Sequence, residues 1–148
     1  MSTCFLGEYH HVVDKKGRMS VPAKFRPGLG DIFFLVRGSE KCLYAYPAEE
    51  WNRIVEHMRT SESFTKKSSQ KFLRKFYSSA GEIEIDAMGR ILIPNNLRDE
   101  VGFTDKTDVA VIGVANRVEI WSAEAWAAYC VEDEEDLDIG SGMEIFDI

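Results

Sequence analysis

The sequence predicts a mixed α/β fold, rich in β-strands, that is built from two tandem copies of one small unit. Three observations predict it: an internal repeat, apolar residues that alternate along short segments of both copies, and a glycine turn at matched positions. The chain has 148 residues, of which 45% are hydrophobic. This is enough for one domain core, or for two very small interlocked ones.

The repeat aligns VVDKKGRMSVPAKFR, residues 12–26, with EIDAMGRILIPNNLR, residues 84–98, at an offset of 84 − 12 = 72 residues. The identical pairs are Asp14 and Asp86, Gly17 and Gly89, Arg18 and Arg90, Pro22 and Pro94, and Arg26 and Arg98. These identities fall at positions with special backbone chemistry, which argues against a chance match.

Each copy is expected to open with a hairpin of two strands. Apolar residues at every second position indicate strands with one buried face: Val13, Met19 and Val21 in the first copy, and Ile85, Ile91 and Ile93 in the second. The glycines of the repeat lie where the chain must reverse, and glycine tolerates the positive φ that tight turns often need.

A short helix should follow each hairpin, because proline suits the first helical position. In the second copy Leu97 and Val101 lie four residues apart on one helix face, and Gly102 is placed to end the helix. The first copy departs from this pattern at Pro27. We therefore expect residues 22–28 to form a single turn before a bend.

A second hairpin and a closing helix complete each copy. The strands are predicted at 32–36 and 42–46 in the first copy, and at 108–113 and 117–121 in the second. Pro47 and Ser122 suit the start of the closing helices, and Trp51 and Trp126 should point back to the core.

The predicted organisation is a first unit at 7–54, a linker helix at 55–79, a second unit at 80–126 and an acidic tail at 130–148. The linker pattern is amphipathic, with an aromatic stripe of Phe72, Leu73, Phe76 and Tyr77 and a basic remainder of Lys66, Lys67, Lys71, Arg74 and Lys75. The basic residues are either a solvated face or phosphate contacts. The composition of the tail favours disorder, although Met143, Ile145 and Phe146 suit docking on a partner.

The composition indicates a soluble, cytoplasmic protein. No run approaches the roughly 18 to 20 apolar residues that span a bilayer, and the N-terminus lacks the pattern of a signal peptide. The three cysteines, Cys4, Cys42 and Cys130, have no CxxC spacing, so we expect reduced thiols.

The net charge of −7 conceals an asymmetry between the halves. Residues 1–80 hold 14 basic and 8 acidic residues, a charge of 14 − 8 = +6, whereas residues 81–148 hold 4 and 17, a charge of 4 − 17 = −13. Such an imbalance suggests an anion-binding part and an acidic tail.

The doubled Asp-x-x-Gly-Arg turn supplies the candidate DNA-binding site. An arginine on an exposed two-stranded ribbon can contact phosphate oxygens or guanine edges in a major groove. The candidate contact residues are Arg18, Lys16, Lys15 and Arg90, and the candidate turn-shaping residues are Asp14, Gly17, Asp86 and Gly89. In the structural alternative the aspartates accept turn N–H groups and the arginines only pair with them.

Three further basic residues of the opening helices are secondary candidates: Lys24, Arg26 and Arg98. They are either phosphate contacts or solvent-facing helix charges. The first turn, with Lys15, Lys16 and Arg18, should supply most of the electrostatic attraction, because the second offers Arg90 alone.

An enzyme is not expected. His10, His11 and His57 have no nucleophile and carboxylate arranged around them, and neither GxSxG nor a GxxxxGK[ST] phosphate loop is present. Adjacent strand residues face opposite sides, so His10 and His11 are poorly placed to share a metal. No cofactor, metal or small-molecule substrate is predicted.

Four segments, FLGEYHHVVDKKGRMSVPAKFR, CLYAYPAEEW, SSAGEIEIDAMGRILIPNNLR and GVANRVEIWSAEAW, together resemble the bacterial MraZ family. Each half is similar to the AbrB regulators, and the resemblance implies swapped hairpins interlocked into a double β-barrel with pseudo-two-fold symmetry and short flanking helices. The family motif falls on Asp14, Arg18, Asp86 and Arg90, with Lys16 beside the first arginine. Pro27 and the tail after Tyr129 depart from the family pattern.

The resemblance implies a nucleoid-associated transcriptional regulator that binds promoter DNA at direct repeats before the division and cell-wall gene cluster. It also implies a homo-oligomeric ring, octameric or larger, and no membrane partner. The alternative hypothesis is an oligomeric interaction scaffold, or an antitoxin-like protein, that binds a protein partner through the acidic tail.

Overall fold

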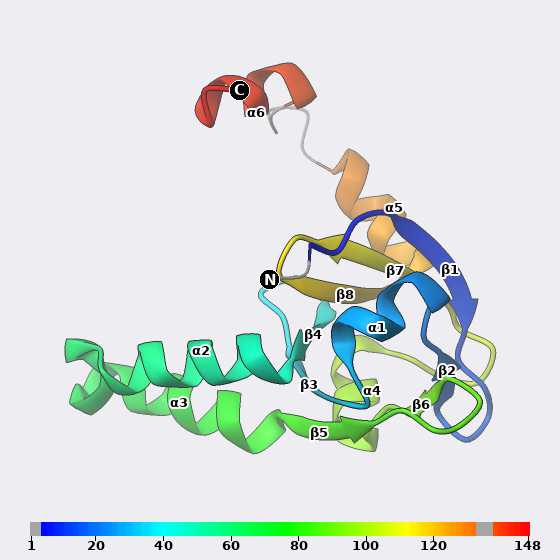
Figure 1. Cartoon of the computed structure of the whole chain (residues 1–148), viewed down its shortest axis with the longest axis horizontal. Helices are drawn as coiled ribbons and strands as arrows, with labels where there is room; N and C mark the ends of the chain where they lie inside the picture. The colour runs from blue at the N-terminus through cyan, green and yellow to red at the C-terminus, as the bar shows by residue number, and fades with distance from the viewer. Residues whose placement is uncertain (1–3, 133–137) are drawn as a thin grey trace.

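The computed structural model describes residues 4–132 and 138–148, and its fold is mixed α/β and rich in β-strands (Figure 1). In chain order the elements are β1 (Glu8–Val12), β2 (Arg18–Ser20), η1 (Ala23–Phe25), α1 (Arg26–Leu29), β3 (Ile32–Arg37), β4 (Cys42–Pro47), α2 (Ala48–Arg59), η2 (Glu62–Thr65), α3 (Lys67–Ser79), β5 (Gly81–Glu84), β6 (Arg90–Leu92), α4 (Asn95–Val101), β7 (Asp108–Val114), β8 (Arg117–Ser122), α5 (Ala123–Val131) and α6 (Ile139–Ile145). Within these residues no helix is long and apolar enough to cross a membrane.

The two copies exchange their opening strands. A six-stranded antiparallel sheet has the order β1-β7-β8-β4-β3-β5, so β1 of the first copy pairs with β7 of the second, and β5 of the second pairs with β3 of the first. The hairpins β3–β4 and β7–β8 meet in the middle of the sheet, where β4 pairs with β8. Neither copy therefore completes its sheet without the other.

A separate two-stranded ladder, β2–β6, joins the copies at the repeat itself. Met19 pairs with Ile91 at its centre, and the flanking pairs are Arg18 with Leu92 and Ser20 with Arg90. The two flanking pairs are equivalent, because Arg18 corresponds to Arg90 and Ser20 corresponds to Leu92 in the repeat. The internal pseudo-two-fold axis thus passes between Met19 and Ile91, which are each 2% exposed. In the described part of the chain the pairing closes no barrel, since β1 and β5 are the edges of the larger sheet, and the expected double barrel is not confirmed.

The larger of two hydrophobic clusters serves both copies, and the smaller one lies against α5. Buried side chains close to the two turns, Val13, Met19, Ile91 and Ile93, belong to the same cluster as those of the central strands. Phe25 from η1 packs edge-on against the rings of Phe5 and Tyr9, at centroid distances of 5.7 and 5.2 Å. Burial of the alternating apolar residues in one shared core explains why the halves interlock.

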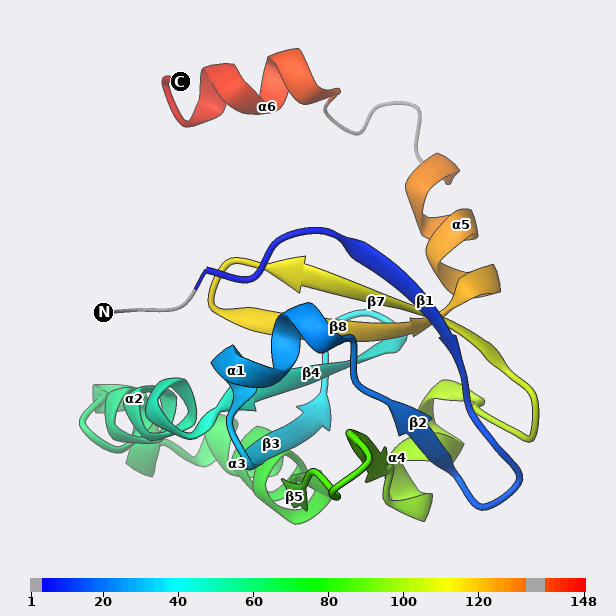
Figure 2. The same ribbon diagram turned by 45° about the vertical axis from the view of Figure 1, so that its right-hand side comes forward.

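The segment expected to be one linker helix contains the end of α2, the turn η2 and helix α3, which lie side by side in Figures 1 and 2. Helix α2 begins directly after Pro47 and ends at Arg59, where the Thr60 hydroxyl donates to the Glu56 carbonyl at 2.9 Å. Ser61 then caps η2 by accepting from the Ser63 amide. These capping bonds make a helical hairpin, and a single helix over 55–79 was the wrong expectation.

The expectation of a single turn before Pro27 was also wrong. Residues 23–29 form two consecutive short helices, η1 and α1, and Pro27 lies in the first turn of α1. Proline is tolerated there because the first helical N–H groups have no partner within the helix. Of the tail, residues 133–137 lie outside the described part, and the rest includes the short helix α6.

The exchanged strands predict that the two copies unfold together. Replacing Ile91 by alanine should lower the free energy of unfolding by about 2–5 kcal/mol, because a fully buried side chain is lost from the shared core. Urea unfolding followed by tryptophan fluorescence and by far-UV circular dichroism should still give one coincident transition. Leu92→Ala is the control, because Leu92 is 56% exposed and should change stability little. Two separated transitions in either variant would contradict a shared core.

Candidate nucleic-acid interface

The two Asp-x-x-Gly-Arg turns have the same backbone geometry. In the first, the Asp14 amide donates to the Arg18 carbonyl at 2.8 Å and the Gly17 amide donates to the Asp14 carbonyl at 2.9 Å. The second repeats these bonds, from Asp86 to Arg90 at 2.9 Å and from Gly89 to Asp86 at 3.0 Å. The first turn connects β1 to β2 and the second connects β5 to β6, but the connected strands pair with strands of the other copy and not with each other. The expected strand pairing within each opening hairpin was therefore wrong.

Each aspartate carboxylate lies at the centre of its turn. One oxygen of Asp14 accepts from the amides of Lys16 and Arg18, both at 2.9 Å, and the other accepts from Arg18 Nε at 2.9 Å. Asp86 repeats this with the amides of Met88 and Arg90 at 2.9 Å and with Arg90 Nε at 3.2 Å. The Arg18 and Arg90 amides are the main reason that the pKa of each carboxyl lies below its usual value.

Each turn arginine is hydrogen-bonded through Nε, and its two terminal nitrogens remain available for a ligand. Their ion pairs with the aspartates use Nε, and the terminal Nη1 and Nη2 atoms have no hydrogen-bond partner within the described residues. The side chains of Arg18 and Arg90 are 33% and 31% exposed. Such a guanidinium is orientated in advance and keeps four N–H donors for a ligand.

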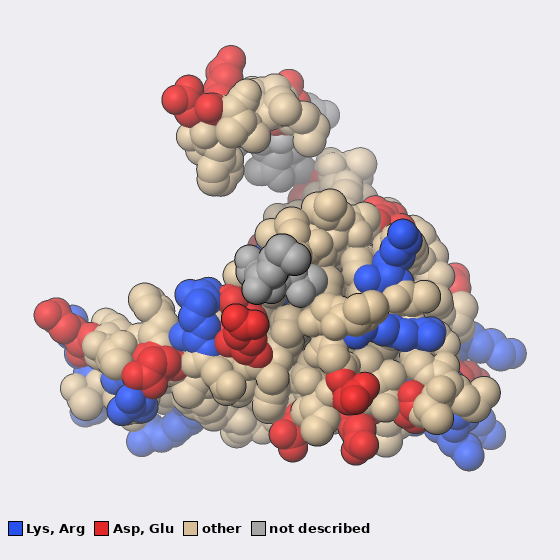
Figure 3. Space-filling model, in the orientation of Figure 1, with Lys and Arg blue, Asp and Glu red and all other residues tan. Residues whose placement is uncertain are grey.

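The tips of the two turns differ in charge. Lys15 and Lys16 are exposed at the first tip, whereas Ala87 and Met88 are exposed at the second. Lys and Arg side chains gather at the lower right edge in Figure 3, where Figure 1 shows the turns beyond β2 and β6. The structure thus places Lys15, Lys16, Arg18 and Arg90 at one end of the molecule.

The loops beside the two turns also differ: the one beside the first turn carries Lys106 together with Asp105 and Asp108, and the one beside the second carries Asp31. The Val13 carbonyl accepts from the Lys106 amide at 2.8 Å, so a loop of the second copy adds an exposed lysine beside the first turn. At the matched place beside the second turn, the Ile85 amide donates to the carbonyl of Asp31 at 2.9 Å. The repeat did not reveal Lys106, because the sequence pattern does not show which loop flanks an exchanged hairpin.

Each turn glycine is covered by an arginine of the other copy. The φ angles of Gly17 and Gly89 are +86° and +79°, and an added Cβ would overlap the guanidinium of Arg98 at Gly17 and that of Arg26 at Gly89. The Gly17 carbonyl also accepts from the Ile93 amide at 3.0 Å, and the Gly89 carbonyl accepts from the Val21 amide at 2.9 Å. The positive φ favours glycine at both positions, and an added Cβ would also force the arginine of the other copy to move.

Arg26 and Arg98 have a structural environment that neither sequence interpretation described. Arg26 Nε donates to the Val21 carbonyl at 2.9 Å, and Arg98 Nε donates to the Ile93 carbonyl at 2.9 Å. Both are half-buried against the opposite turn, so they position the site, whereas Lys24 is exposed. Each arginine follows the turn glycine of its own copy at the same spacing, and this repeated spacing was the signal in the sequence that could have suggested a role in positioning the turns.

The histidines do not assemble into a site. His10 Nε2 lies 2.7 Å from a carboxylate oxygen of Glu8, and burial is the main cause that lowers the pKa of His11. In the part of the chain that the structure describes, no group of three metal-ligating side chains converges.

Comparison with known proteins gives one consistent result. The family model described as "MraZ protein, putative antitoxin-like" matches residues 4–75 and again residues 76–140. A curated protein of Ligilactobacillus salivarius (strain UCC118), the transcriptional regulator MraZ, is 48% identical over 145 residues, which cover 97% of this chain and 99% of that protein.

The covered glycines predict that Gly17→Ala is destabilising. Its positive φ and the displaced Arg98 should together lower the free energy of unfolding by about 2–3 kcal/mol, measured in urea. Gly142→Ala is the control, because an added Cβ there meets no atom within 4 Å. The double variant Gly17→Ala, Arg98→Ala should lose less free energy of unfolding than the sum of the two single losses, because truncation of Arg98 removes the overlap with the new Cβ. Strict additivity would show that the two residues do not contact each other.

Proposed function

This chain belongs to the MraZ family, and on that premise we propose that it is a transcriptional regulator that binds double-stranded DNA in a sequence-specific manner through its two Asp-x-x-Gly-Arg turns. The observation that carries the proposal is the pair of arginines, Arg18 and Arg90, each held through Nε and free at Nη1 and Nη2 in the described structure. The two turns lie beside one ladder, β2–β6, so both arginines belong to one surface.

The aspartates prepare the arginines for binding. A guanidinium that is already ion-paired through Nε loses less conformational freedom when its other nitrogens bind, and the planar pair of Nη atoms suits guanine O6 and N7 or two phosphate oxygens. A two-stranded ribbon is narrow enough to enter a major groove. Asp14 and Asp86 therefore act through the arginines, and Arg26 and Arg98 act through the backbone of the turns.

The electrostatic attraction to phosphates comes mainly from the first turn. Lys15, Lys16 and Arg18 lie within one tip, and Lys106 is beside it, whereas Arg90 is the cation of the second tip. Contacts of lysine and arginine with phosphates release counterions and make affinity depend on salt. The local grouping of these cations allows a chain of net charge −7 to bind DNA.

Assembly would convert weak single contacts into useful affinity. We extend the proposal to a homo-oligomeric ring whose turns engage direct repeats in the promoter of the division and cell-wall gene cluster, in association with the nucleoid. Linked copies raise the effective concentration of each further turn once the first has bound. The spacing of the repeats then contributes to specificity together with the base contacts.

Removing both turn arginines tests whether DNA binding depends on these two side chains or only on the total positive charge of the chain. In a titration of promoter DNA, Arg18→Ala, Arg90→Ala should raise the Kd by at least about tenfold and reduce the slope of log K against log salt by roughly 2. The control is Arg53→Ala, Arg59→Ala on α2, which removes the same charge from side chains that are 62% exposed and lie in the helical hairpin. Equal affinity of the two double variants would refute the proposed interface.

The single variants test the inequality of the turns. Arg18→Ala should weaken binding more than Arg90→Ala, because Arg18 acts together with Lys15 and Lys16. Charge neutralisation of Lys15 and Lys16 in the Arg18→Ala background should remove most of the remaining salt dependence. A larger loss in Arg90→Ala than in Arg18→Ala would reverse the assignment of the dominant turn.

A further inference from the structure

Helix α3 carries an aromatic surface that the rest of the described chain leaves partly uncovered. Its ring stack begins at Phe34 of β3, which lies 5.0 Å from Trp51 of α2. The stack continues from Trp51 to Phe76 and from Phe76 to Phe72, each at a centroid distance of 5.5 Å. Phe72 ends the stack and is 57% exposed, and Tyr77, whose ring lies edge-on to that of Phe76, is 40% exposed. No residue of α3 is fully buried.

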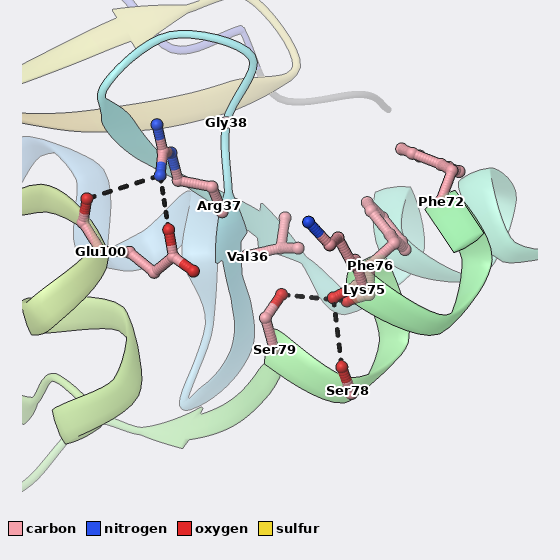
Figure 4. A pocket seen from close by; sticks show the side chains of 9 residues that line it. All are labelled: Val36, Arg37, Gly38, Phe72, Lys75, Phe76, Ser78, Ser79 and Glu100. Atoms are coloured by element: carbon pink, nitrogen blue, oxygen red, sulfur yellow. Dashed lines mark hydrogen bonds and ion pairs between the residues drawn. The ribbon is translucent and has the colours of Figure 1, made fainter.

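Phe72 forms a ridge between two hollows. On one side is a cavity of about 380 Å³ between α3 and the end of β3, and Figure 4 shows Phe72, Lys75 and Phe76 along the α3 side of it. On the other side a smaller apolar hollow of about 120 Å³ lies towards η2, lined by Met58, Phe64 and Leu73 among others. A ridge between hollows is a shape that apolar side chains of a bound helix can fill.

The cations around this surface have no acidic partners in the described structure. No ion pair involves Lys66, Lys67, Lys71, Arg74 or Lys75. The arginines of the neighbouring helix differ, since Arg53 and Arg59 pair with Glu50 and Glu56. We call Phe72, Tyr77 and these five basic residues the α3 surface.

The C-terminal segment 138–148 has the opposite character. Its exposed apolar residues are Ile139 (81%), Met143 (47%), Ile145 (62%), Phe146 (76%) and Ile148 (83%). Its charged residues, Asp138, Glu144 and Asp147, are all acidic, and the sequence has no lysine or arginine after Arg117. Large apolar side chains grouped at a protein surface are typical of a site of contact with another molecule.

We propose that the α3 surface binds the C-terminal segment 138–148 of a second copy of this chain. The apolar residues of α6 would cover Phe72 and enter the hollows beside it, and its carboxylates would face the unpaired cations of α3. A second copy is the source because α6 lies well away from α2 and α3 of its own chain in both views (Figures 1 and 2). The contact involves neither turn, so it is independent of the proposed DNA binding.

Disulfide trapping between full-length chains tests this contact. Cys4 and Cys130 are replaced by serine, and Cys42 can remain because burial raises the pKa of its thiol to about 12 and keeps it unreactive. One chain then carries Ser69→Cys, at the smaller hollow, and the other carries Ser141→Cys, on α6. The two are mixed under mild oxidation, and the disulfide-linked products are identified by mass.

The mixed dimer should exceed each homodimer several-fold. Adding Phe72→Ser to the first chain should reduce its yield about tenfold, as expected for loss of one large apolar contact. Leu92→Ser is the matched control, because Leu92 is 56% exposed but lies on β6, and it should leave the yield unchanged. Circular dichroism of each variant verifies that the fold is retained.

Three results would overturn the proposal. A mixed dimer no more abundant than the homodimers would show that α6 does not reach the α3 surface of another chain. A predominant Ser69→Cys homodimer would show that α3 binds another α3. A disulfide closed within one chain that carries both cysteines would show that the tail docks on its own α3.

Discussion

The close approach of an arginine of one copy to a turn glycine of the other is the contact on which the end of the molecule with the two turns depends. Arg98 covers Gly17 and Arg26 covers Gly89, so a Cβ at either position would displace the arginine that covers it. The backbone bonds from Ile93 and Val21 to the same glycines tie each turn to the strand of the other copy. The turns, the β2–β6 ladder and the shared core therefore form one unit, and the site exists only when both halves have folded together.

This reciprocal frame explains how the two turns remain alike in shape while they differ in charge. The aspartate, glycine and arginine of each turn are all used by bonds or close contacts, whereas the tip side chains make no hydrogen bond that the turn needs. Lys15 and Lys16 can thus correspond to Ala87 and Met88 without altering the backbone. The symmetry of the repeat constrains the backbone geometry of the two turns, whereas the charge at their tips can differ between the copies.

The repeat and the alternating apolar residues predicted both turns and the second hairpins, β3–β4 and β7–β8, because these depend on local chemistry. They did not predict the exchange of β1 and β5 between copies, which only the family resemblance implied, because an alternating apolar pattern does not specify the partner strand. They misjudged Pro27 for a related reason: the proline restricts the preceding helix but also suits the start of a new one. The roles of Arg26 and Arg98 depend on contacts with turn glycines of the other copy, 89 − 26 = 63 and 98 − 17 = 81 residues away in the sequence, which become visible only in the folded chain.

The structure also changes what the charge asymmetry means. Of the +6 carried by residues 1–80, residues 61–79 hold 5 − 1 = +4, and these surround α3, away from the turns. Of the −13 carried by residues 81–148, residues 130–148 hold −8. Much of the imbalance thus lies in two additions to the repeated frame, a basic hairpin after the first copy and an acidic tail after the second. The case for DNA binding consequently rests on a few cations at the turn tips, and the overall imbalance is better matched to a contact between copies of the chain.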